Sequence, residues 1–166
     1  MGEGQELFSW LSDFIQNKSW IILGVGNRLK GDDGVGSLIA GELEQALGKE
    51  KVCDAGIAPE NHLSWVEKHK PDVLIIIDSV DFQDQPGKIR LFSLKELSQQ
   101  NLFTHNLPLG ILGDFLSLLG VDLVYILGIQ PRQVQFGEGL SPAVERAKEL
   151  VKELFLRLSK RWVNCG

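Results

Sequence analysis

The sequence predicts an α/β fold, a three-layer αβα sandwich around a mostly parallel five-stranded sheet with one antiparallel edge strand. Short apolar runs alternate along the chain with segments whose apolar residues recur at helical spacing, which is typical of a sheet covered by helices on both faces. One further strand follows the turn Gln85-Pro86-Gly87. Its connection is too short for a parallel crossover, so we expect it to pair antiparallel at an edge.

The first half of the chain alternates helix and strand. Residues 6–17 place five apolar side chains on one stripe, which predicts an amphipathic helix packed on the domain. The apolar run 20–25 predicts a strand buried on both faces, and residues 34–48 combine helical spacing with a terminal glycine. Residues 51–54 are a short strand candidate, and residues 60–70 predict a helix that ends before a proline.

The second half continues this alternation. Residues 72–78 predict a strand rich in isoleucine, and residues 88–93 predict the edge strand after the turn. Apolar residues between 111 and 119 mark another helix, and residues 122–129 predict the fifth strand. A last helix is expected to start at Ser141-Pro142, because proline is favoured at the first helical position.

Length and composition limit the class of protein. A chain of 166 residues predicts one domain, with residues 1–19 as an N-terminal helical extension and residues 20–160 as the core. A formal net charge of −5 argues against binding to nucleic acid or to an anionic membrane surface. The apolar runs are too short to cross a bilayer, the N-terminus is acidic, and Cys53 and Cys165 lie far apart. We therefore expect a cytoplasmic protein with no nucleic-acid partner and no membrane insertion.

Polar residues follow the predicted strands at the points where these strands end. Asp32 and Asp33 follow the first strand, and Asp54 follows the second. Asp78 ends the third strand, and Gln130 follows the fifth. Because ligands bind beyond the carboxyl ends of the strands in such sheets, we expect these side chains along one edge.

Two of these acids and one histidine form a candidate metal site. His105 lies in the loop before the helix that leads into the fifth strand. Carboxylates from Asp33 and Asp78 with this imidazole would suit a divalent first-row metal such as nickel or zinc, with positions open for water or substrate. Each residue also has a structural interpretation, because an acid at a helix start is an ordinary N-cap and a lone loop histidine is usually solvated. The spacing leads to a candidate metal site and no further.

Other chemistries fit the sequence less well. The run from Gly24 to Leu29 begins like the dinucleotide motif GxGxxG, but Leu29 replaces the third glycine and two acids would repel a pyrophosphate. The sequence contains no phosphate-binding GxxxxGK[ST] loop, no HExxH zinc helix and no GxSxG nucleophile elbow. We expect Cys53 to be a small buried hydrophobe rather than a nucleophile.

Eight short motifs occur in one order along roughly residues 20–157. They are Gly24-Val25-Gly26-Asn27, Gly31-Asp32-Asp33-Gly34-Val35-Gly36, Ala58-Pro59-Glu60-Asn61, Ile77-Asp78, Pro86-Gly87-Lys88-Ile89-Arg90, Thr104-His105-Asn106, Leu127-Gly128-Ile129-Gln130-Pro131 and Leu140-Ser141-Pro142. Each motif is weak alone, but their combination resembles the nickel–iron hydrogenase maturation endopeptidases. The resemblance is closest to the branch that serves hydrogenase 3, the formate-hydrogenlyase type.

The resemblance implies removal of a C-terminal extension from a hydrogenase large subunit precursor after nickel insertion. It implies that Asp33, Asp78 and His105 are the metal-binding and catalytic residues, with nickel supplied by the precursor and no organic cofactor. It also implies that the loop at Asp54 and Gly56 recognises the substrate, although Ala55 replaces a glycine that relatives often carry. Two alternatives stay open, a nickel-binding or carrier protein without peptidase activity and a zinc hydrolase of small molecules.

Overall fold

The fold is built on one five-stranded sheet in the order β2-β1-β3-β5-β4. The computed structural model describes residues 2–100, 102, 104, 106–137 and 139–163. Three of the pairings, β1 with β2, β1 with β3 and β3 with β5, are parallel, and β4 joins β5 antiparallel at the edge. The predicted sheet with a single antiparallel edge strand is therefore confirmed. The strands are β1 (Trp20–Val25), β2 (Val52–Gly56), β3 (Val73–Ser79), β4 (Ile89–Ser93) and β5 (Leu123–Ile129).

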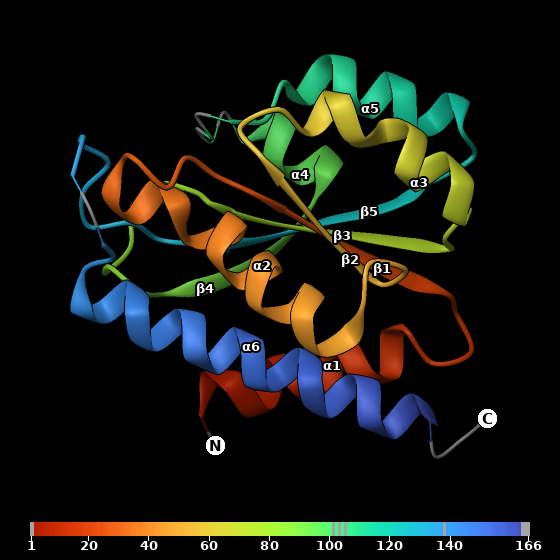
Figure 1. The fold of residues 1–166 in the computed structure, drawn as a ribbon, viewed down its shortest axis with the longest axis horizontal. Helices are drawn as coiled ribbons and strands as arrows, with labels where there is room; N and C mark the ends of the chain where they lie inside the picture. The colour runs from red at the N-terminus through yellow and green to blue at the C-terminus, as the bar shows by residue number, and fades with distance from the viewer. Residues whose placement is uncertain (1, 101, 103, 105, 138, 164–166) are drawn as a thin grey trace.

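Helices cover both faces of this sheet, which confirms the predicted three layers (Figure 1). One face packs against α1 (Glu3–Phe14), α2 (Val35–Leu47) and α6 (Pro142–Val163). The other face packs against α3 (Leu63–His69), α4 (Leu94–Gln99) and α5 (Leu109–Leu118). The central strands are buried along their whole length, as their continuous apolar sequences require.

Three elements differ from the prediction. β2 runs to Gly56, so Asp54 lies inside the strand rather than after it. The helix expected over 60–70 is a 3-10 turn, η2 (Pro59–His62), followed by α3. The short helix α4 was not predicted, although Ser93 and Glu96 form a complete capping box at its start.

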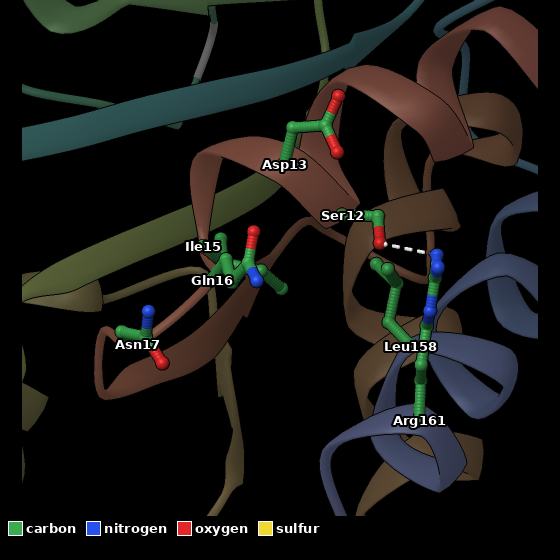
Figure 2. Close-up of a pocket in the computed structure, with 7 residues that line it drawn as sticks. All are labelled: Ser12, Asp13, Ile15, Gln16, Asn17, Leu158 and Arg161. Carbon is green, nitrogen blue, oxygen red and sulfur yellow. Dashed lines mark hydrogen bonds between the residues drawn. The ribbon is translucent and has the colours of Figure 1, made fainter. Parts of the chain in front are cut away.

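The N-terminal helix packs on both α6 and the sheet, where Trp10 and Phe14 contact Tyr125 of β5. Leu11 and Ile15 are buried in the cluster that α2 and α6 share. A pocket of about 190 Å³ lies between the end of α1 and α6, where Arg161 Nη1 donates to Ser12 Oγ at 2.8 Å (Figure 2). This pocket lies near the start of β1, so it is at the opposite end of the sheet from the strand-end acids. Among the described helices, none is both long and apolar enough to cross a membrane.

Candidate active site

Two buried carboxylates, Asp33 and Asp78, meet where β1 and β3 end. Asp33 lies in the 3-10 turn η1 (Gly31–Gly34) after β1, and Asp78 is the penultimate residue of β3. Both residues are no more than 1% exposed. Asn106 Nδ2 donates to Oδ1 of Asp33 at 2.9 Å and to Oδ1 of Asp78 at 3.3 Å. The structure thus brings together two of the three predicted metal ligands.

A glycine in the first turn of α2 makes this close approach possible. A Cβ placed on Gly36 would lie 2.1 Å from the carbonyl oxygen of Ile77 and 2.3 Å from that of Val25. Helix α2 therefore begins directly against β1 and β3, where a larger residue would overlap the backbone. The η1 turn that precedes α2 is consequently held over the ends of both strands.

The two carboxylates differ in the hydrogen bonds that their oxygens accept. Asp33 accepts hydrogen bonds on both oxygens, from Ser79 Oγ at 3.2 Å and from Asn27 N at 3.3 Å, in addition to Asn106. Asp78 Oδ1 accepts from Ser79 N at 2.8 Å, whereas its Oδ2 is buried and has no hydrogen-bond partner among the described residues. A buried carboxylate oxygen without a donor, beside a second carboxylate, fits the coordination of a cation.

Burial raises the pKa of the Asp78 carboxyl well above its ordinary value, and the neighbouring charge of Asp33 raises it further. Hydrogen bonds from Asn106 and Ser79 and the nearby Thr104 side chain act against this rise, but they do not cancel it. Among the described residues, the donors around Asp78 therefore stabilise its ionised form poorly, and a cation bound at the pair would favour that form.

The third predicted ligand, His105, lies outside the described residues. Over the part of the chain that is described, no group of three or more His, Cys, Asp or Glu side chains could hold a metal ion. The predicted three-residue ligand set consequently stays a prediction. The neighbouring Asn106 is described, and its side-chain amide contacts both acids.

Asp32 has a structural role that differs from that of its neighbour Asp33. Its carboxylate is fully buried and accepts four hydrogen bonds. The donors are the amides of Arg132, Gln133 and Ser141 and the Ser141 hydroxyl, at 2.7–3.2 Å. Asp32 thus ties the loop after β5 to the turn after β1, which an N-cap would not do.

Asp54 belongs to a separate network. Arg28 Nη2 contacts its Oδ2 at 2.8 Å, and Ser37 Oγ donates to its Oδ1 at 2.8 Å. Gly56 N also donates to Oδ1, at 3.0 Å, and Gly56 itself adopts φ +56°, a conformation that favours glycine. None of the described hydrogen bonds or ion pairs joins Asp54 directly to Asp33 or Asp78.

In the described contacts, Gln130, which follows β5, and Cys53, near the start of β2, do not join the carboxylate pair. Gln130 accepts hydrogen bonds from the amides of Phe82 and Asp84 on its Oε1, so it shapes the loop after β3. Cys53 is half-buried, and burial, together with the charges of Glu44 and Asp54, raises the pKa of its thiol to about 11. Since the thiolate is the nucleophilic form, this cysteine is a poor nucleophile at neutral pH.

Sequence reasoning missed the role of Asn106. The residue stands in the Thr104-His105-Asn106 motif, but nothing in its type or spacing indicates that one amide would bridge two acids. The only indication of this role in the sequence was the motif as a whole, which predicts a polar loop before α5.

Comparisons with known sequences agree on one family. A family model described as hydrogenase maturation protease matches residues 38–158. The hydrogenase 3 maturation protease of Escherichia coli K12 is 36% identical over 148 residues, which cover 88% of this chain and 92% of that protein. A putative hydrogenase maturation protease of Methanocaldococcus jannaschii is 32% identical over 136 residues, or 76% of this chain and 80% of that protein.

Solved structures share the fold as well. The NiFe hydrogenase maturation protease HycI of Thermococcus kodakarensis superimposes with a TM-score of 0.79 at 26% identity, covering 91% of this chain and 99% of that one. A crystal structure of a hydrogenase 3 maturation protease gives 0.69 at 36% identity, covering 81% and 87%. With a matching family model over most of its length and relatives of this similarity, the chain belongs to the hydrogenase maturation protease family.

Proposed function

We propose that this protein is an endopeptidase that removes the C-terminal extension of a nickel–iron hydrogenase large subunit precursor after nickel has been inserted. Its family supports the proteolytic activity and the class of substrate. The observation that carries the recognition step is the buried Asp33–Asp78 pair, in which one carboxylate oxygen has no hydrogen-bond partner among the described residues.

The nickel ion carried by the precursor supplies the positive charge that this pair lacks. Asp33 and Asp78 would contact the ion through their oxygens, and His105 would add an imidazole nitrogen, a ligand type that suits nickel. A precursor without nickel brings no cation to these two carboxyl groups, so its docking lacks this electrostatic attraction. The protease thereby distinguishes nickel-loaded from nickel-free precursor when the precursor docks.

The residues around the pair have positioning roles in this proposal. Asn106 holds the two carboxylates together through one amide, and Asn27 and Ser79 fix the orientation of Asp33. Both oxygens of Asp54 are already bound, by Arg28 and by Ser37. Asp54 therefore stabilises the loop at Gly56 and does not activate water. The proposal includes a cytoplasmic location, which the free thiol of Cys53 suits.

A mass-spectrometric processing assay tests the proposal. It compares nickel-loaded and nickel-free precursor from the same organism, treated with wild-type protein, His105→Ala or the control His69→Ala. His69 lies on α3, where its Nε2 contacts Glu50 at 2.7 Å, away from the two acids. We expect loss of a C-terminal peptide only from loaded precursor, abolished by His105→Ala and retained by the control.

Other outcomes separate the alternatives. Equal cleavage of loaded and nickel-free precursor would keep the peptidase and remove the recognition of nickel. No cleavage of a verified loaded precursor, with tight nickel binding by the isolated protein, would favour a nickel carrier. Hydrolysis of generic amides by a zinc-containing preparation would favour a small-molecule hydrolase.

A further inference from the structure

Three large apolar side chains are exposed on loops at the strand-end edge of the sheet. Leu29 is 67% exposed, Ile57 64% and Phe136 79%. They follow β1, β2 and β5, the same edge at which Asp33 and Asp78 lie. We call these three residues the apolar rim. Single exposed apolar residues are common on proteins, so exposure alone does not make the rim a binding surface. The contacts of the loops that carry the rim are therefore the relevant evidence.

Backbone contacts join the loops of Leu29 and Phe136. Gly137 N donates to Leu29 O at 3.1 Å, and Gly31 N donates to Gly137 O at 3.1 Å. Lys30 forms a parallel bridge with Gly137, and its Nζ lies 5.2 Å from the centre of the Phe136 ring. The backbone segments that carry Leu29 and Phe136 therefore lie side by side.

The same loops are fixed by a buried charge. Asp32 binds the amides of Arg132 and Gln133 before Phe136, and the amide and hydroxyl of Ser141 after it. Burying a carboxylate is costly unless its donors are well placed, and here four donors meet it. The fold thus holds the backbone on both sides of Phe136, which reduces the loop entropy lost when a partner binds.

The rim is connected to the carboxylate pair through Asn27. Asn27 N donates to Asp33 Oδ2 at 3.3 Å, and Asn27 Oδ1 accepts from Leu29 N at 3.0 Å. On the other side, Gly26 N donates to the carbonyl of Gly56, directly before Ile57. The segment that contacts Asp33 therefore also contacts the backbone of Leu29 and the backbone next to Ile57.

We propose that the apolar rim binds large apolar side chains of the precursor segment next to the scissile bond. This inference rests on the proposed function and adds a preference of the protease for large apolar side chains next to the scissile bond. The rim continues the edge of the sheet that holds Asp33 and Asp78, so a polypeptide that brings nickel to these acids also approaches the rim. Burial of Leu29 and Phe136 against apolar side chains of this segment would contribute to docking of the substrate.

The test measures kcat and KM for processing of nickel-loaded precursor by Leu29→Ser and Phe136→Ser. We expect KM to rise about tenfold or more in each, as expected when an exposed apolar side chain no longer becomes buried, with unfolding midpoints close to wild type. The matched control is Leu118→Ser, because Leu118 is 84% exposed on α5 at the end that leads into β5. We expect its KM to stay within about twofold of wild type, as for a surface change outside the interface.

A second arm tests direct contact. Large apolar residues next to the bond in the precursor are changed in turn to serine, and each change is combined with Phe136→Ser. Direct contact predicts that at least one combined loss is smaller than the product of the two single losses.

Unchanged KM in both rim variants, while wild type processes the loaded precursor, overturns the rim and leaves the proposed function intact. The rim is likewise overturned as a substrate-binding surface if wild type is a dimer that these variants disrupt without any change in KM. Absence of processing by wild type overturns both proposals.

Discussion

Two buried acids at the ends of β1 and β3, Asp32 and Asp78, differ in how their carboxylates are hydrogen-bonded. Asp32 has four hydrogen-bond donors around a buried carboxylate, whereas Asp78 has one buried oxygen without a described partner and faces Asp33. The first arrangement stabilises a charge that holds a loop. The second leaves charge uncompensated, which is expected of a site that receives a cation.

The same chemical change should therefore have opposite effects on stability at these two positions. Asp78→Asn removes a buried charge beside Asp33, so we expect an unfolding free energy equal to or above that of wild type at pH 7, with processing lost. Asp32→Asn places an amide group against hydrogen-bond donors, and we expect a loss of about 2–4 kcal/mol. Urea denaturation with the processing assay measures both. A large destabilisation by Asp78→Asn would contradict the assignment of Asp78 to the site.

A pH effect is expected at Lys51. Burial lowers the pKa of Lys51 from 10.5 to about 8, and its Nζ lies 3.4 Å from the centre of the Trp20 ring. The unfolded chain binds this proton more tightly than the folded protein, so the contribution of Lys51 to stability should rise from pH 8 towards pH 10.5. In Lys51→Met this rise should be absent. Urea denaturation of both proteins at pH 7.5 and 9.5 tests it, and parallel changes in the two would refute it.

Close packing between α2 and the sheet determines where the turn that carries Asp33 lies. Gly36 allows the helix to start against the carbonyl oxygens of Val25 and Ile77, and this contact positions the turn that carries Asp33. Gly36 belongs to the motif Gly31-Asp32-Asp33-Gly34-Val35-Gly36, and the structure shows that a Cβ at this position would overlap the backbone of β1 and β3. In an ordinary helix, alanine would be the better residue at such a position.

Gly36→Ala should accordingly destabilise the protein despite the higher helix propensity of alanine. We expect a loss of more than about 2 kcal/mol, because the new Cβ meets backbone atoms that cannot move independently. Gly110→Ala in α5 is the matched control, since its Cβ would have nothing within 4 Å. We expect Gly110→Ala to be neutral or stabilising by up to about 1 kcal/mol. Equal thermal shifts in the two variants would show that the packing at Gly36 is unimportant.

Local patterns predicted the elements better than the contacts between them. The apolar runs predicted the central strands, because strands buried on both faces must be apolar throughout. The short helix α4 was missed although Ser93 and Glu96 carry its capping signal, since only one turn of apolar spacing follows. The Arg28–Asp54 ion pair joins residues far apart in sequence, and no local pattern specifies such a pairing.

The strand order explains the location of the site at the scale of the whole molecule. From β1 the chain moves outward to β2 and then returns to place β3 on the other side of β1 (Figure 1). The ends of β1 and β3 are therefore a switch point, where open α/β sheets bind ligands. Asp33 and Asp78 lie there, as the sequence predicted from the strand ends. The burial that leaves Asp78 short of donors depends on packing, and the sequence alone could not show it.

In the proposed function, Asp33 and Asp78 contact the nickel carried by the precursor. The most direct measurement is nickel-edge X-ray absorption of loaded precursor, alone and mixed with the protease, frozen before cleavage. We predict added oxygen or nitrogen ligands at about 2.0–2.2 Å with wild type, as for other first-row metals in proteins, and none with Asp33→Ala or Asp78→Ala. A nickel spectrum unchanged by wild type, in a mixture that goes on to cleave the precursor, would contradict the claim.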